Sequence, residues 1–98
     1  MTIALTILEQ LGGNKFKVMT GAKDFVSHGT SLTFRLPAKF AKNKSNYVTI
    51  TLTPDDLYRM EFCFYRAMNL RTISKHEGLY ADMLQSVFTE QTGLDTHL

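Results

Sequence analysis

The stretch Ser31-Leu-Thr-Phe-Arg-Leu36, followed after ten residues by Tyr47-Val-Thr-Ile-Thr-Leu-Thr53, decides the fold of this chain. Apolar and polar side chains alternate strictly in both segments, which predicts two β-strands with one buried face. The apolar residues point inward, whereas polar residues such as Thr33 and Thr49 point outward. Segment 37–46 between them is a basic loop, so we expect the two strands to be antiparallel neighbours.

Further strands are predicted on both sides of this pair. Lys15–Thr20 alternates in the same way, and Phe25–Val26 is a short strand or a continuation of it. Residues 57–66 allow two interpretations. Their alternating, strand-forming side chains favour a strand, whereas the preceding Thr53-Pro-Asp-Asp56 is typical of a helix start. We favour the strand, keep the helix as an alternative, and expect a last strand over Leu70–His76.

A helix is predicted at each end of the chain. The first runs from Thr2 to about Leu11, because its apolar residues form one stripe, and Gly12-Gly13 ends it. The second covers Leu79–Gln91, with Gly93 as its stop signal. The sequence therefore predicts one α+β domain over residues 1–98. Its N-terminal helix, about five-stranded antiparallel sheet and C-terminal helix would leave the other sheet face open.

The charges of this chain are sorted by position. Residues 15–53 hold seven basic residues and one acid, a net charge of +6, while the rest holds four basic and eight acidic residues, a net charge of −4. From Glu77 onward there are four acids and neither lysine nor arginine. A basic middle beside an acidic end indicates a surface that binds an anion.

Outward-pointing strand residues and the 37–46 loop together form the predicted site. Lysine and arginine can follow phosphates and aromatic rings can stack on bases, so we expect a surface that binds single-stranded nucleic acid. The alternative is protein–protein interaction, with a host protein or by self-assembly into an oligomer. The candidate nucleic-acid-binding residues are Lys15, Lys17, Arg35, Lys39, Lys42, Lys44, Tyr47 and Arg59.

Catalytic signals are weak, so we expect a protein that is not an enzyme and needs neither cofactor nor metal. His28, His76 and His97 lie far apart and lack metal-ligand spacing with Cys63. Met19-Thr-Gly-Ala-Lys23 lacks the spacing of a phosphate-binding loop.

The lone Cys63 cannot form an internal disulfide, which favours a reducing compartment. No apolar run approaches the roughly 18 residues that span a bilayer, and the first residues lack the basic start of a leader. We expect a cytoplasmic protein that does not enter a membrane.

Several phrases carry a resemblance: Leu11-Gly-Gly-Asn-Lys-Phe16, Met19-Thr-Gly-Ala-Lys23, Glu77-Gly-Leu-Tyr-Ala-Asp-Met-Leu84 and Phe88-Thr-Glu-Gln-Thr-Gly-Leu94. With them the chain, from Leu8 to Leu98, resembles small uncharacterised proteins encoded by tailed bacteriophages and prophages. The resemblance implies a phage accessory protein of the host bacterial cytoplasm and carries over no functional residue. It also implies a strand over 57–66.

Overall fold

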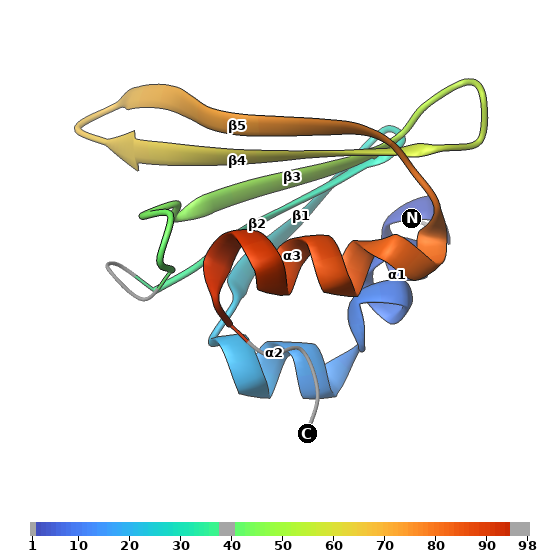
Figure 1. Ribbon diagram of the computed structural model, residues 1–98, viewed down its shortest axis with the longest axis horizontal. Coiled ribbons are helices and arrows are strands. Elements are labelled where there is room, and N and C mark those ends of the chain that lie inside the picture. The colour runs from blue at the N-terminus through green and yellow to red at the C-terminus, as the bar shows by residue number, and fades with distance from the viewer. Residues whose placement is uncertain (1, 38–40, 95–98) are drawn as a thin grey trace.

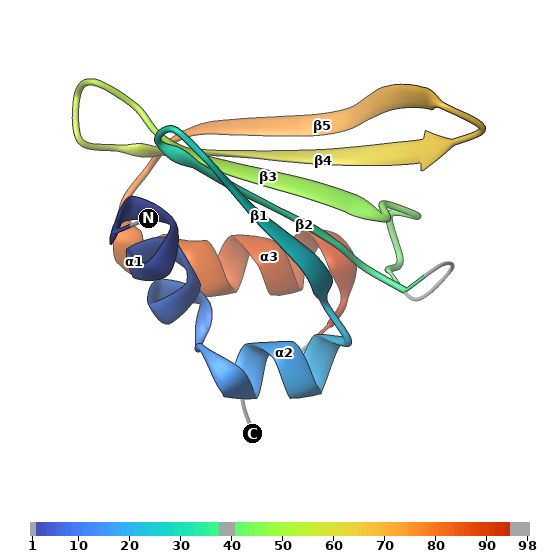
Figure 2. The same ribbon diagram turned by 180° about the vertical axis from the view of Figure 1, so that it is seen from behind.

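The computed structural model describes residues 2–37 and 41–94 as a five-stranded antiparallel sheet with three helices on one face (Figure 1). The strands follow one another in the order β1-β2-β3-β4-β5, so each strand pairs with its neighbour in sequence. The view from behind shows the same two layers and leaves the far face of the sheet without a helix (Figure 2). The elements are α1 (Thr2–Leu11), α2 (Asn14–Thr20), β1 (Lys23–His28), β2 (Ser31–Arg35), β3 (Tyr47–Leu52), β4 (Tyr58–Arg66), β5 (Asn69–Leu79), a 3-10 turn η1 (Ala81–Met83) and α3 (Leu84–Thr92).

The predicted α+β class is confirmed, and so are both terminal helices and the strands over 31–36, 47–53, 57–66 and 70–76. Residues 57–66 form a strand because Tyr58, Met60 and Phe62 are buried in alternation with less buried neighbours. The helix-like Thr53-Pro-Asp-Asp56 instead makes a tight turn, in which the Thr53 hydroxyl donates to the Leu57 carbonyl at 2.8 Å. The residues typical of a helix start therefore form no helix here, because the strands on both sides of them pair in the sheet.

The predicted strand over Lys15–Thr20 is wrong, because these residues form α2. Phe16 and Thr20, four residues apart, are both buried, and the Thr20 hydroxyl donates to the Phe16 carbonyl at 2.7 Å. Gly21 then ends the helix in the left-handed conformation, with φ of 73°. A six-residue alternation fits one buried helical face as well as a strand. The sheet still has five strands, because β1 forms over Lys23–His28. This strand contains the predicted Phe25–Val26 segment and is longer at both ends.

The C-terminal helix starts later than predicted. Leu79 is the last residue of β5 rather than the first of a helix, and η1 separates it from α3. The reason is a bulge in β5. Tyr58 pairs with Leu79 but Met60 pairs with His76, so β5 has one residue more than β4 between these two pairs. Gly78, with φ of 67°, supplies the left-handed conformation there and turns the Leu79 side chain into the core.

Four phenylalanines form the centre of the core between the sheet and the helices. Phe88 of α3 lies 5.0 Å from Phe16 of α2 and 6.3 Å from both Phe34 of β2 and Phe62 of β4, measured between ring centroids. All four side chains are fully buried. Phe88 therefore joins the helical layer to two strands of the sheet.

Candidate functional site

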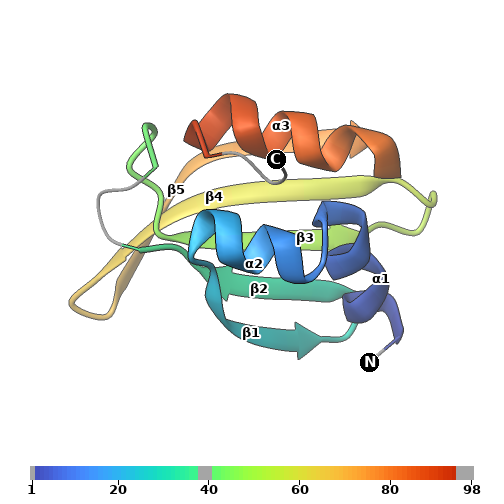
Figure 3. The same ribbon diagram turned by 90° about the horizontal axis from the view of Figure 1, so that it is seen from below.

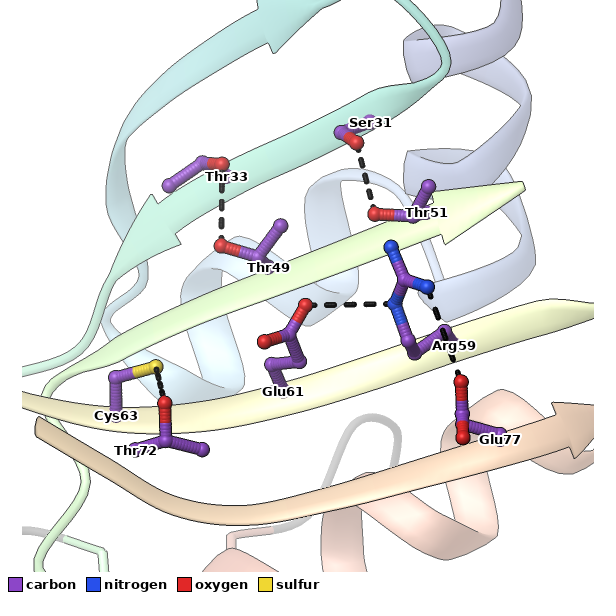
Figure 4. A network of polar contacts seen from close by, with 9 residues as sticks. All are labelled: Ser31, Thr33, Thr49, Thr51, Arg59, Glu61, Cys63, Thr72 and Glu77. Carbon is purple, nitrogen blue, oxygen red and sulfur yellow. Dashed lines mark hydrogen bonds and ion pairs between the residues drawn. The ribbon is translucent and has the colours of Figure 1, made fainter. Parts of the chain in front are cut away.

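The open sheet face around Arg59 is a balanced polar network rather than a basic surface. Nε of Arg59 lies 3.4 Å from Oε1 of Glu61, and its Nη1 lies 3.8 Å from Oε1 of Glu77 (Figure 4). Beside this trio, hydroxyls pair across β2 and β3, Ser31 with Thr51 at 2.8 Å and Thr33 with Thr49 at 3.3 Å. Because two carboxylates face the Arg59 guanidinium, this part of the face offers no excess positive charge to a phosphate.

The antiparallel meander gathers positive charge at one end of the sheet instead. The starts of β1, β3 and β5 and the ends of β2 and β4 all meet there, together with the 41–46 part of the loop, on the left in Figure 1. The acids on this side among the described residues are Asp24, 3.9 Å from Arg35, and Glu90 on α3. We call this region the basic end, and its six basic residues within the described part of the chain are Lys23, Arg35, Lys42, Lys44, Arg66 and Arg71.

The opposite end of the sheet carries the other sign. The turn between β3 and β4, the end of β5 and the following 3-10 turn meet there. We call this region the acidic end, and among described residues it holds Arg59 with four acids, Asp55, Asp56, Glu77 and Asp82. The charge segregation seen along the sequence thus becomes a segregation along the strands of the folded sheet.

The backbone around Lys42 and Lys44 in the loop is held in place by hydrogen bonds. Asn46 donates from Nδ2 to the Tyr65 carbonyl at 2.9 Å and accepts from the Tyr65 N–H at 2.7 Å. At the other side, the Lys42 N–H donates to the Thr92 carbonyl at the end of α3, at 2.7 Å. A lysine is favourable there because a helix C-terminus carries partial negative charge. Lys42 and Lys44 are therefore fixed between α3 and the end of β4.

Aromatic rings lie on both faces of the sheet at the basic end. On the open face the guanidinium carbon of Arg35 lies 5.2 Å from the Tyr65 ring centroid, and Tyr47 lies 6.1 Å from Tyr65. On the helix side the guanidinium carbon of Arg71 lies 5.9 Å from the centroid of Phe64. Rings next to cations are the combination that single-stranded nucleic acids require, because bases stack and phosphates need a counter-charge.

A groove of about 490 Å³ opens beside one of these rings, lined by Ala41, Lys42, Lys44 and Phe64. None of its described lining residues is acidic. We call it the Phe64 groove. Two other grooves are smaller, about 290 Å³ between α1 and β1 and about 220 Å³ on the outer side of α2, and each has a single lysine in its lining. Only the Phe64 groove, among these three, combines two cations with an aromatic wall.

The structure divides the eight predicted site residues. Arg35, Lys42, Lys44 and Tyr47 come together at the basic end, whereas Arg59 lies at the acidic end between two carboxylates. Predicted to project from a strand, Lys15 and Lys17 instead belong to α2 in the helical layer, where the Lys17 ammonium lies 5.1 Å from the Phe25 ring centroid. Lys39 lies outside the described residues.

Sequence reasoning missed Phe64, Arg66 and Arg71. Phe64 alternates with outward-pointing residues along β4, which predicts an inward position, and it does point to the helix side. There it is only half-buried, because the β4–β5 hairpin extends past the helices (Figure 3). The predicted order of antiparallel strands could have revealed these residues. In such a sheet the end of each strand lies beside the start of the next one.

Within residues 2–37 and 41–94 the remaining reactive groups form no second site. Cys63 is buried on the open face beside Thr72, and burial raises the pKa of its thiol, which disfavours the thiolate. Among the described residues no group of three or more His, Cys, Asp or Glu side chains could hold a metal. No helix in this part of the chain has the length and apolar character needed to cross a membrane.

Comparisons of this chain with family models, with curated proteins and with solved structures found no match.

Proposed function

We propose that this protein binds single-stranded nucleic acid at the basic end of its sheet, as a small non-enzymatic accessory protein of a tailed bacteriophage or prophage. The observation that carries the proposal is the convergence of six basic residues from four strands and the loop, beside Tyr47, Phe64 and Tyr65. The predicted interface on the whole open face is thereby reduced to one end of it, because ion pairs with Glu61 and Glu77 occupy Arg59.

This arrangement supports a contact that is mainly electrostatic. Lysine and arginine side chains that neutralise phosphates release counterions, which gives affinity with little base specificity. The hydroxyls of the open face are largely paired with one another, as Ser31 is with Thr51, so they do not supply a set of free base-reading groups. We therefore propose sequence-tolerant binding, in which the rings add stacking to the phosphate contacts.

Salt-dependent fluorescence anisotropy tests this function. With a labelled single-stranded oligonucleotide, we expect the affinity to fall linearly on a double-logarithmic plot between about 50 and 200 mM salt, with a slope equivalent to several phosphate contacts. A labelled duplex of the same length is the matched ligand. Absence of binding at about 50 mM salt, or an affinity that ignores salt, would contradict the proposal.

A second function, head-to-tail self-association, is favoured by what each end of the sheet exposes. Exposed apolar side chains accompany the charges at both ends, namely Met68 and Leu70 beside the cations and Tyr80 and Met83 beside the acids. An apolar centre with complementary charges around it is the composition of a protein interface. We infer that the basic end of one copy can bind the acidic end of the next, an arrangement that builds a ring or a filament.

Charge-swapped variants test this association by sedimentation. The K42E/K44E variant cancels the net positive charge of the basic end and the D55K/D56K variant makes the acidic end basic, so we expect each alone to remain monomeric at low salt. Mixed together, the two variants should associate, because each offers the end that the other needs. Wild-type protein that stays monomeric at high concentration and low salt, or a mixture that does not associate, would overturn this second function.

A further inference from the structure

We propose that the Phe64 groove is a subsite for one unpaired base of the bound strand, with the base against the Phe64 ring and its phosphate between Lys42 and Lys44. The inference rests on the proposed function and deepens it, because it names unpaired bases as the recognised class. It also assigns a base-contacting role to a residue that strand alternation places with the core.

Phe64 lies on a part of β4 that the helical layer does not fully cover. Phe16, Phe34, Phe62 and Phe88 are fully buried, whereas Phe64, on the same side of the sheet as Phe62, is only partly covered. The helices end before this part of β4, as the view from the helix side shows (Figure 3). A ring that the core does not use is thus left at the wall of an open groove.

The Phe64 ring lies among basic side chains. Lys42 and Lys44 line the same groove, and the guanidinium of Arg71 lies over the Phe64 ring. The methylene stem of Lys42 packs over Gly93, where a Cβ would lie 3.3 Å from Cδ of the lysine, so this side chain is supported as well as charged. An occupant with both an aromatic plane and negative charge meets all of these groups, which describes a nucleotide unit.

The Phe64 groove is large enough to hold a nucleotide unit. Its volume of about 490 Å³ falls within the range of small-molecule sites, roughly 300–1,000 Å³, and therefore admits a base with its sugar. A base held in a duplex has its faces stacked on its neighbours, so it cannot lie against Phe64 without leaving the helix. The groove therefore favours single strands over duplexes, a preference that phosphate contacts alone would not produce.

The absence of tryptophan from the sequence allows a direct test. In the F64W variant, the indole is the only tryptophan, and its fluorescence reports on a base stacked against it. We expect a single-stranded oligonucleotide to quench this fluorescence, and an oligonucleotide of the same length with all bases removed to bind more weakly and to leave the fluorescence unchanged. Equal quenching by the two ligands would overturn the subsite.

The F64L variant gives an independent readout, with F25L as the matched control, because Phe25 is also half-buried but lies on β1 away from this groove. Because F64L loses one stacked base, we expect its affinity for single strands to fall by about tenfold and its affinity for duplexes to change little. The F25L variant should bind both ligands as the wild-type protein does. If wild-type protein binds oligonucleotides with the expected salt dependence but F64L binds like F25L, the subsite fails and the proposed function stands. If wild-type protein binds neither ligand, both fail together.

Discussion

Replacing Phe88 by alanine is expected to lower the free energy of unfolding by about 3–5 kcal/mol, the largest effect of any single change considered for this chain. Its ring lies within 6.3 Å of three other buried rings, so alanine leaves a cavity that three elements border and cannot easily fill. A domain of this size has only about 5–15 kcal/mol of stability in total. We therefore expect the F88A variant to be partly or wholly unfolded at moderate temperature, as measured by circular dichroism in a urea titration.

Val18→Ala is the control for this measurement. Val18 is 81% exposed on α2, so its truncation is expected to change the free energy of unfolding by no more than about 0.5 kcal/mol. A loss below about 1 kcal/mol in F88A would contradict the four-ring core, because that value is typical of a side chain that packs at the surface.

Reversing the charges of the loop is expected to weaken single-strand binding at about 50 mM salt by at least tenfold. The K42E/K44E variant removes two cations from the basic end and adds two anions, so the dependence of log affinity on log salt should become shallower by about two contacts. Anisotropy titrations at several salt concentrations measure both quantities. Thermal unfolding of the same variant shows whether the fold is retained.

The K15E/K17E variant separates the position of the charge from its amount. It changes the net charge of the protein by the same amount, but both of its residues lie on α2 rather than at the basic end. We expect its affinity to fall by less than about threefold, through the long-range field alone. Equal losses in the two variants would mean that net charge, rather than the basic end, determines binding.

Much of the fold could be predicted from the sequence because the pattern was long and one-sided. The alternation in β2, β3 and β4 extends over five or more residues, and the glycines at 12, 21 and 93 end helices as their conformational freedom allows. The error over residues 15–20 has a physical cause. In so short a segment, one buried Phe16 satisfies a helix and a strand equally, and only its packing against Phe34 and Phe88 decides between them.

The candidate site was less predictable, because its position depends on how far the helical layer extends over the sheet. Alternation gave the correct faces for Arg35 and Tyr47, but it could not show that Arg59 meets Glu77 from a different strand. Nor could it show that the helices stop short of Phe64, since that depends on the lengths of the helices relative to β4. Partners across strands and the extent of a covering layer are properties of the assembled fold, and a single sequence carries them only indirectly.

The contact between α1 and α3 has a consequence for how the protein is made. The Gln85 side chain donates from Nε2 to the Leu11 carbonyl at 2.9 Å, joining residues 74 positions apart. Because the ribosome produces α3 after the whole sheet, only α1 and α2 can cover the apolar side of the newly made strands until residues 84–92 have emerged. A nascent chain that stalls before that point would lack the Phe88 ring that packs against Phe34 and Phe62, so part of its core would be exposed to chaperones and proteases.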